Sequence, residues 1–279
     1  MHKERENIRL VSSDLNGTLV HQHTMMDMIR VYFPQQPERY EKADEAFTKQ
    51  TAGLLSMKEA FAIAGPLTKG LSLRNAIEYV TEEMRFLEGF EDLITTLSKH
   101  GKQFVINSTG YSVTTEATKA LYGSEKIYGV ICNRLIFAWD GDPRRPIDEA
   151  HLCQLVRNYF LGKKEETLYD ETLATGEVEL GIQDEGEKAT LLFTIAERLK
   201  IPRTAIAHIG DTMGDSAGIY EIARNGGLGI AFNYNEALKQ YLEPVLEQEK
   251  ILGEIILVEP KSKRADLRKL LKMLVPGPK

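Results

Sequence analysis

The sequence is poor in cysteine and contains no long uninterrupted apolar stretch. Among its 279 residues there are two cysteines, Cys132 and Cys153, and no set of histidines and cysteines has a zinc-ligand spacing. No apolar run approaches the roughly 18 residues that a membrane-spanning helix needs, and residues 1–6 are charged rather than a basic stretch leading into an apolar one. These absences argue against a disulfide framework, a structural zinc site, a membrane partner and export, and they favour a reducing cytoplasm.

Glycine (22 residues) and proline (10 residues) are too few for a collagen-like or low-complexity chain, and an apolar content of 42% predicts a compact protein. The formal net charge of −6 at pH 7 argues against nucleic acid as the main partner. A small phosphorylated metabolite could still bind through local positive charge. The sequence carries no signal for an oligomeric state.

Short apolar segments alternate with amphipathic ones along most of the chain, which predicts an α/β fold. The spacing predicts strands at 8–12, 102–107, 130–137, 177–182, 205–209 and 229–232, and helices at 90–100, 148–161 and 187–199. Between residues 25 and 84 the spacing is helical only. We therefore expect a parallel-sheet core with a helical insertion at about 21–86.

Polar side chains follow several of the predicted strands. Asp14 and Ser108 come after the first two strands, Lys188 opens a helix, and Asp211 and Asp215 follow the strand at 205–209. Ligands of open parallel sheets lie beyond the carboxyl ends of the strands, so these side chains are expected to converge. Carboxylates hold Mg²⁺ through hard oxygen ligands, while a hydroxyl and an ammonium suit phosphate oxygens. The set fits phosphoryl transfer through an attacking carboxylate.

Four segments, Asp14-Leu-Asn-Gly-Thr, Ser108, Lys188 and residues 210–215, resemble in order and spacing the four motifs of the haloacid dehalogenase (HAD) superfamily. Residues 227–233 are similar to the phosphoserine phosphatase-like branch. The resemblance implies a Rossmann-like core, here 1–20 and 87–279, and a small helical cap domain, here 21–86, inserted after the first strand.

The resemblance also implies a role for each motif residue. Asp14 would be the nucleophile, and Ser108, Thr109 and Lys188 would bind the phosphate, with Lys188 also serving catalysis. Mg²⁺ would be held by Asp14, by the main-chain carbonyl of Asn16 and by Asp211, with Asp215 supporting the metal shell. The cap would choose the substrate.

Asn16 departs from the family pattern, because phosphatases of the family carry a second aspartate two residues after the nucleophile. Asn16 therefore occupies a catalytic position where it cannot exchange a proton, and such general acid–base help is worth about 10²–10⁴-fold in rate. A second departure is His23, which falls where phosphoserine phosphatases have a cap glutamate for the substrate's amino group. This argues against phosphoserine as the substrate.

Other interpretations of the same residues compete with these. Asn16-Gly17 between apolar residues is also a signal for a tight β-hairpin. His21 and His23 are candidates to steer substrate or supply the missing proton, and Arg144 and Arg145 are candidates for phosphate contacts, although such exposed residues are more often simply solvated.

His208 lies inside an apolar strand and is expected to be a satisfied core residue. The basic stretch 261–272 is expected to pack a terminal helix onto the core.

The leading hypothesis is thus a Mg²⁺-dependent HAD phosphatase that hydrolyses a small phosphorylated metabolite through an aspartyl-phosphate intermediate. The alternative is a catalytically weak or inactive member in which Asn16 replaces the general acid and the site binds a phosphorylated ligand or partner. A third possibility is a phosphotransferase that passes the phosphoryl group from Asp14 to an acceptor other than water.

Overall fold

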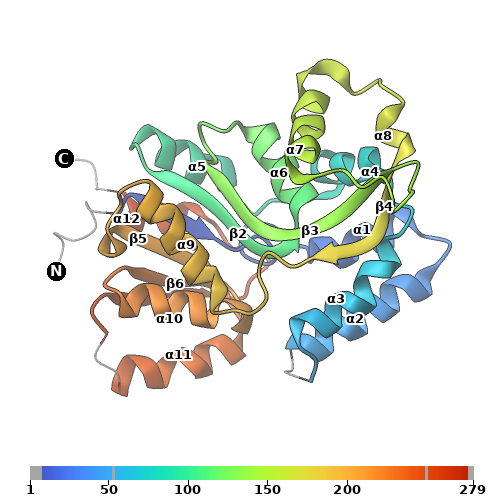
Figure 1. The fold of residues 1–279 in the computed structure, drawn as a ribbon. Helices are drawn as coiled ribbons and strands as arrows, with labels where there is room; N and C mark the ends of the chain where they lie inside the picture. The colour runs from blue at the N-terminus through green and yellow to red at the C-terminus, as the bar shows by residue number, and fades with distance from the viewer. Residues whose placement is uncertain (1–7, 52–53, 249–250, 276–279) are drawn as a thin grey trace.

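The computed structural model describes residues 8–51, 54–248 and 251–275, and it contains one seven-stranded sheet in the order β4-β3-β2-β1-β5-β6-β7 (Figure 1). Every neighbouring pair is parallel except the antiparallel pair of β3 and β4 at one edge. The strands are β1 Leu10–Ser13, β2 Gln103–Tyr111, β3 Gly129–Trp139, β4 Thr172–Glu179, β5 Ile206–Gly210, β6 Leu228–Tyr234 and β7 Glu254–Pro260. The predicted α/β parallel-sheet core is confirmed.

Helices cover both faces of this sheet. Leu10 and Val11 are neighbours on β1 and belong to separate apolar clusters, because successive strand residues point to opposite faces. The cluster of Val11 includes residues of α5 Phe90–Lys99, α6 Ser112–Tyr122 and α12 Arg268–Leu274. The opposite face packs against α9 Glu187–Arg198, α10 Ser216–Arg224 and α11 Glu236–Gln248. The terminal helix expected within 261–272 is present as α12, and its Leu270 and Leu274 are buried.

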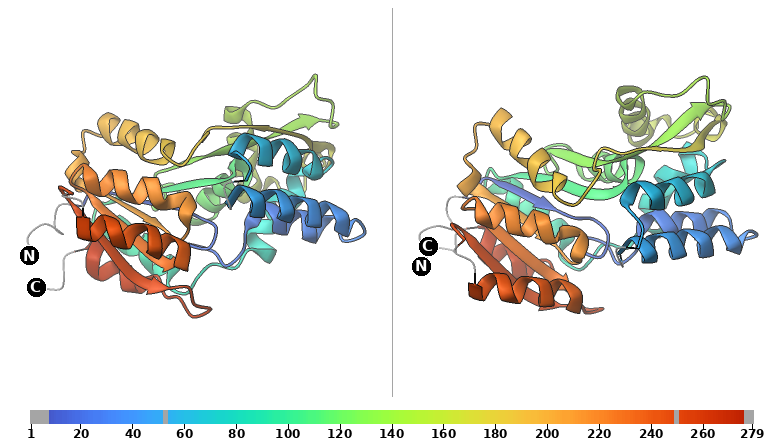
Figure 2. Two further views of the ribbon diagram at one scale, coloured as in Figure 1. Left: turned by 90° about the horizontal axis from the view of Figure 1, so that it is seen from below. Right: turned by 60° about the horizontal axis from the view of Figure 1, so that its bottom comes forward.

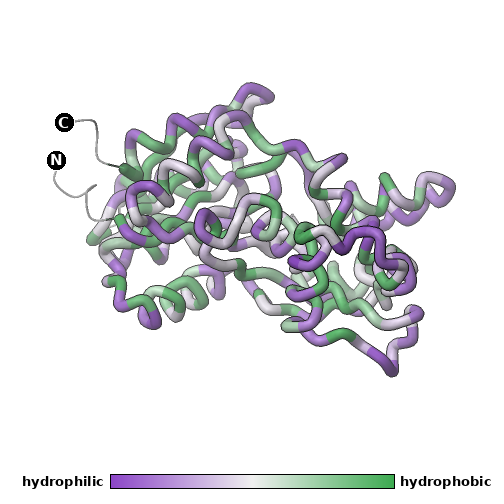
Figure 3. The backbone as a smooth tube through the Cα atoms, turned by 90° about the horizontal axis from the view of Figure 1, so that it is seen from above, coloured by the Kyte–Doolittle hydropathy of each residue, from purple (hydrophilic) through white to green (hydrophobic). Residues whose placement is uncertain are grey.

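Helix α5 illustrates why these segments fold as they do. Its buried residues are Phe90, Leu93, Ile94 and Leu97, which is the i, i+3, i+4, i+7 spacing of one helix face. Figure 3 shows the same alternation of apolar and polar residues along other helices of the molecule. None of the helices in the described part of the chain combines the length and the apolar character needed to cross a bilayer.

The insertion after the first strand is helical, as the spacing predicts. It contains α1 Thr24–Tyr32, α2 Pro37–Thr51, α3 Met57–Ala64, the 3-10 turn η2 Gly65–Thr68, α4 Leu73–Glu78 and the π-helical turn η3 Tyr79–Glu83. Helix α3 begins at a capping box in which Ser56 and Glu59 satisfy each other's backbone N–H groups. Figure 2 shows α1 to α3 beside the core strands rather than against the faces that α5 and α9 cover.

A second excursion from the core lies next to this insertion. It runs from the distal half of β3 through α7 Glu149–Asn158, the π-helical turn η4 Tyr159–Lys163 and α8 Leu168–Glu171 into β4. On α4, Arg74 donates to both carboxylate oxygens of Asp170, at 2.7 and 3.0 Å, and to the main-chain carbonyls of Lys164 and Glu166. The division into residues 1–20 with 87–279 and residues 21–86 stays a prediction, and its segments 1–7 and 276–279 lie outside the described residues.

Two strands differ from the sequence-based expectation. The strand expected at 177–182 lies at Thr172–Glu179, because its pairing with β3 starts at Trp139 and Thr172 and accommodates Gly176 at a φ of +90°. Strand β7 was not expected from the sequence, and most of its residues are only half-buried because it lies at the edge of the sheet.

Because Arg74 joins the two excursions, its loss should destabilise the fold. We expect Arg74→Ala to lower the free energy of unfolding by about 1–2 kcal/mol, the range for charged hydrogen bonds at a partly exposed site. Urea denaturation measures this change. The matched control is Arg144→Ala, which among the described residues forms an ion pair only with Asp142, two residues away. If Arg74→Ala lowers the free energy of unfolding no more than the control does, Arg74 does not stabilise the contact between the two excursions.

Candidate active site

The predicted site residues lie at the carboxyl ends of three adjacent strands at the centre of the sheet. Asp14 directly follows β1, Ser108 lies near the end of β2, and Asp211 directly follows β5. Asp215 ends the 3-10 turn η6 Met213–Asp215 after β5, and Lys188 lies in the first turn of α9. The convergence that the sequence predicts is therefore present.

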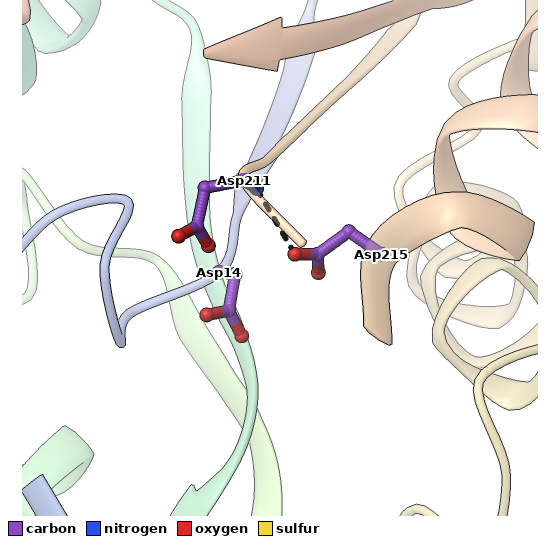
Figure 4. A group of neighbouring side chains, drawn as sticks. All are labelled: Asp14, Asp211 and Asp215. Atoms are coloured by element: carbon purple, nitrogen blue, oxygen red, sulfur yellow. Dashed lines mark hydrogen bonds between the residues drawn. The ribbon is translucent and has the colours of Figure 1, made fainter. Parts of the chain in front are cut away.

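Asp14, Asp211 and Asp215 form a compact cluster of carboxylates. One oxygen from each side chain lies within 4.8 Å of the others, and the three residues are only 6%, 1% and 1% exposed. Figure 4 shows the side chains gathered at the ends of the strands, with the main-chain N–H of Asp211 donating to Asp215 Oδ2 at 3.1 Å.

Two glycines make room for this cluster. A Cβ added to Gly17 would lie 2.2 Å from Asp211 Oδ2, and one added to Gly210 would lie 2.2 Å from the Asp215 Cβ. Gly17 also has a φ of +79°, which a residue with a side chain rarely adopts.

The hairpin interpretation of Asn16-Gly17 is wrong, because both neighbours of β1 in the sheet are parallel.

Lys188 is the buried cation of the cluster. Its Nζ lies 3.0 Å from Asp14 Oδ1 and 2.6 Å from Asp215 Oδ1. Burial disfavours the charged ammonium, but the two carboxylates outweigh burial and raise the pKa of Lys188 above its ordinary value. Lys188 therefore stays charged and holds Asp14 and Asp215 in fixed positions.

The three carboxyl groups are not electrostatically equivalent. Burial raises the pKa of Asp14, and Lys188 only partly opposes this rise. Burial would also raise the pKa of Asp215, but Lys188 outweighs it and holds that pKa below its usual range. For Asp211, burial and the nearby carboxylates of Asp215 and Asp14 together raise the pKa well above the ordinary value.

This imbalance fits a divalent cation. Asp211 receives a hydrogen bond from the Thr18 hydroxyl at 2.9 Å, and among the described residues the one cationic side chain within 4.0 Å of it is Lys261, at 4.0 Å. A buried carboxylate without a close cation is costly, so the cluster has more negative charge than its single buried lysine balances. Three carboxylates that offer hard oxygen ligands at this spacing suit Mg²⁺.

On the other side of Asp14 lies Ser108, which is buried and accepts a hydrogen bond from the Gly110 N–H at 3.2 Å. Hydrogen bonding from its hydroxyl counteracts part of the rise in the pKa of Asp14. Thr109 is half-buried, and its main-chain carbonyl accepts a hydrogen bond from Asn133.

Asn16 is held by the first residue of α1. Its side-chain oxygen accepts hydrogen bonds from the main-chain N–H and from the hydroxyl of Thr24, both at 2.9 Å. A Cβ on Gly110 would lie 3.6 Å from Asn16 Nδ2 and 3.4 Å from Ser108 Oγ, so the amide lies close to the Ser108 side of the site.

Four further residues around the cluster were not predicted as site residues. His208 Nε2 lies 3.8 Å from Asp215 Oδ1, and its Nδ1 lies 3.1 Å from the Ser12 hydroxyl. Thr18 contacts Asp211 as described, and Lys261 is the other cation near it. Asn233 donates to the carbonyl of Gly17 at 2.7 Å. Of these four residues, only His208 has a sequence feature that could have predicted it. His208 and Ser12 are polar residues inside two predicted apolar strands, and the structure pairs them side by side.

The electrostatic surroundings of His23 and of the arginine pair disfavour the roles considered for them. Burial lowers the pKa of His23 to about 4, so its imidazole is neutral at pH 7. Arg144 and Arg145 form ion pairs with Asp142 and Asp140 in their own loop.

Comparisons with known proteins agree with this architecture. No family model matches the chain. Curated relatives include phosphoserine phosphatases from Archaeoglobus fulgidus, 23% identical over 245 residues, and from Streptomyces coelicolor, 24% identical over 232 residues. The matches cover 88% and 83% of this chain but 58% and 46% of the relatives, so the chain spans about half the length of the curated relatives it matches.

Solved structures are similar over almost the whole chain. A substrate-bound phosphoserine phosphatase complex superposes with a TM-score of 0.65 at 20% identity, covering 96% of this chain and 98% of the other. A HAD family hydrolase from Salmonella enterica serovar Typhi gives 0.63 at 18% identity, covering 97% of this chain and 72% of the other. The predicted resemblance to the HAD superfamily and its phosphoserine phosphatase-like branch is confirmed as a similarity of sequence, and the fold of the chain is the α/β fold of these solved structures.

The raised pKa of Asp211 predicts a pH dependence of stability in Mg²⁺-free buffer. Because this pKa is higher in the folded than in the unfolded chain, the folded state keeps a proton that the unfolded state loses. Stability from this group is therefore complete below the unfolded value of about 4 and is lost as the pH rises through the folded value. We expect Asp211→Asn to raise the free energy of unfolding at pH 7 by about 1–3 kcal/mol.

Urea denaturation at pH 4.5 and pH 7.5 measures the free energy of unfolding of both chains. It should show the gain for Asp211→Asn at the higher pH and a smaller change between the two pH values than in the original chain. The control is Asp142→Asn, which removes a half-buried carboxylate that already has a cationic partner in Arg144 and should bring no gain. A metal-free Asp211→Asn variant that is less stable than the original chain at pH 7 would contradict the electrostatic account.

Proposed function

We propose that the chain is a Mg²⁺-dependent phosphatase that hydrolyses a small phosphorylated metabolite through an aspartyl-phosphate on Asp14. The observation that carries the proposal is the position of Lys188 Nζ between Asp14 and Asp215, inside a buried carboxylate cluster at the ends of the central strands. The similarity to phosphoserine phosphatases over most of this chain supports it.

In the first step, an Asp14 carboxylate oxygen forms a bond to phosphorus while the bond from phosphorus to the leaving oxygen breaks. The leaving group departs with the electron pair of that bond and takes up a proton from water. In the second step, a water oxygen forms a bond to phosphorus while the bond from phosphorus to the Asp14 oxygen breaks; the attacking water loses a proton to solvent, and inorganic phosphate and the Asp14 carboxylate are released. Lys188 fixes one Asp14 oxygen and so orients the other toward the phosphate.

The phosphate is proposed to lie on the Ser108 side of Asp14. The Ser108 hydroxyl, the Thr109 side chain and the Lys188 ammonium would hold its oxygens, because charge-assisted hydrogen bonds to phosphate are strong. The pKa of Lys188 is raised by its carboxylate neighbours, so it brings a full positive charge to that position.

Asp14, Asp211 and the main-chain carbonyl of Asn16 would hold the Mg²⁺ ion, with Asp215 beside them. When bound, the ion supplies positive charge that offsets the buried carboxylates and the phosphate. Thr18 orients Asp211 by a hydrogen bond at 2.9 Å. Asp215 is tied to the main-chain N–H of Asp211, which keeps the two carboxylates in one arrangement.

Proton transfer is the step for which this chain is poorly equipped. Asn16 occupies the position beside Ser108 where a second carboxyl group would act, and an amide does not exchange a proton at neutral pH. His23 does not replace it as an acid, because burial lowers its pKa to about 4. Turnover is therefore expected to be slow for leaving groups that need protonation.

The same observation favours a second candidate function. With its oxygen engaged by both donors of Thr24, the Asn16 amide is fixed in place and preserves the shape of the site. A chain of this kind would bind a phosphorylated ligand or partner without turning it over. Binding without turnover is thus the alternative to catalysis at the same site.

The substrate is proposed to be a small phosphorylated metabolite in the cytoplasm. The names of the relatives make phosphoserine one compound to test. His23 argues against it, because a neutral imidazole packed 5.0 Å from the Phe47 ring does not balance a substrate ammonium group.

Replacing Asn16 tests catalysis against binding. Aspartate has the same shape and would accept the same two hydrogen bonds from Thr24, so Asn16→Asp adds an exchangeable proton without changing the packing. We expect it to raise kcat for alkyl phosphates by about 10²–10⁴-fold. Phosphate release from a panel of phosphorylated metabolites, with and without Mg²⁺, measures the effect.

Asp14→Ala removes the proposed nucleophile. It should abolish phosphate release both in the original chain and in the Asn16→Asp variant. Asp92→Ala, an exposed aspartate on α5, controls for removal of a carboxylate elsewhere. Release that persists in Asp14→Ala or without any divalent ion would contradict the proposed mechanism. Activity found only in Asn16→Asp would favour the binding alternative.

A further inference from the structure

A cleft of about 710 Å³ lies beside the carboxylate cluster and plays no part in the proposed reaction. One wall is formed by Gly17, His21 and Arg85, which lie where the helical insertion leaves and rejoins the core. The other wall is formed by Asn233 and residues 261–263, which end or follow β6 and β7.

The cleft is positively charged in a chain whose net charge is −6. Arg85, Lys261 and Lys263 line it, and no acidic side chain is among its lining residues in the described ranges. Within the same part of the chain, the side chains of Arg85 and Lys263 have no ion-pair partner at all. Lys261 is 62% exposed and reaches only to 4.0 Å from Asp211 Oδ2. Three cations therefore face one cavity with their charges largely unpaired.

The shape of the cleft is fixed by hydrogen bonds between its walls. Asn233 is buried at a φ of +53°, donates to the carbonyl of Gly17 at 2.7 Å and accepts from the Ser262 N–H at 2.8 Å. On the other wall, the His21 N–H donates to the carbonyl of Arg85 at 2.9 Å. The loops that carry the cations are thus held against one another, which reduces the ordering cost of binding a ligand.

The cleft adjoins the proposed metal site on the side away from the phosphate. The strand order places Ser108 on β2, Asp14 after β1, Asp211 after β5, Asn233 on β6 and Lys261 after β7. Gly17 belongs to both places, because it lines the cleft and a Cβ on it would lie 2.2 Å from Asp211 Oδ2. A ligand whose phosphate lies near Asp14 would reach the cleft by extending past Gly17 and Asp211.

We propose that this cleft binds an anionic group, so that the substrate carries a second phosphate or a carboxylate besides the phosphate that reacts. The proposal rests on the proposed function and narrows its substrate class. Guanidinium and ammonium groups bind phosphate and carboxylate oxygens by charge-assisted hydrogen bonds, and an arginine does so through two parallel N–H groups. The Ser262 hydroxyl lines the same cavity.

The binding experiment uses inorganic phosphate as the probe and needs no turnover. Isothermal titration of the full chain without Mg²⁺ is compared with the double variant Arg85→Gln/Lys263→Gln and with the control Lys99→Gln/Arg198→Gln. The control removes the same charge from exposed positions at the ends of α5 and α9. We expect the cleft variant to lose one phosphate-binding event, or to weaken it by about tenfold or more, and the control to keep it.

The kinetic experiment asks whether the anionic group belongs to the substrate. It compares KM for para-nitrophenyl phosphate, whose leaving group is uncharged before it departs, with KM for 3-phosphoglycerate, which carries a carboxylate. We expect Arg85→Gln/Lys263→Gln to raise KM for 3-phosphoglycerate by about tenfold more than KM for para-nitrophenyl phosphate. The control variant should leave this ratio as it is.

Loss of phosphate binding together with the KM effect supports a dianionic substrate. Loss of binding without the KM effect supports the anion site but assigns it to a free anion, and it overturns the narrowed substrate class. Phosphate binding and a KM ratio that match the control overturn the anion site itself. If the chain has no turnover, the titration still decides the anion site, and the phosphatase proposal fails separately.

Discussion

The arrangement of the site depends on three buried carboxylates that face a single buried ammonium. Asp14, Asp211 and Asp215 lie at the ends of neighbouring strands, and Lys188 contacts only the first and third. Such a cluster destabilises the fold unless a cation balances it, because buried charges lose their hydration. Apolar packing on both faces of the sheet offsets this unfavourable free energy. The fold thus gives up stability at the position where the proposed phosphate chemistry would need charge.

The helical insertion contacts the site through Asn16, where the proposed mechanism lacks an exchangeable proton. Asn16 lies two residues beyond Asp14, and Thr24 at the start of α1 donates both hydrogen bonds to its side-chain oxygen. A movement of α1 would therefore change the position of the Asn16 amide. Through Arg74, the same insertion is also tied to the excursion that carries α8, so two segments distant in sequence are joined by a charged hydrogen bond.

The sequence predicts the α/β core and the converging polar residues because both depend on local patterns. Asp14 and Asp211 follow short apolar segments, and parallel strands bring such positions to one edge. Contacts across the chain leave no local signal. Thr18 and Asp211 are 193 residues apart, and Asn233 and Gly17 are 216 apart. Strand β4 starts at Thr172 because this residue pairs with Trp139 of β3. The residue pattern at 177–182 carries no trace of that pairing, so the strand predicted from it starts too late.

The central claim is that Asp14 receives the phosphoryl group, and trapping that group tests it most directly. Para-nitrophenyl phosphate needs little protonation of its leaving group, so the first step should proceed without an acid at position 16, while attack by water remains slow. Acid quenching followed by peptide mass spectrometry, in the presence of Mg²⁺, should find a phosphoryl group on Asp14. A phosphoryl group on another residue, or none on a chain that binds the ester, would contradict the account.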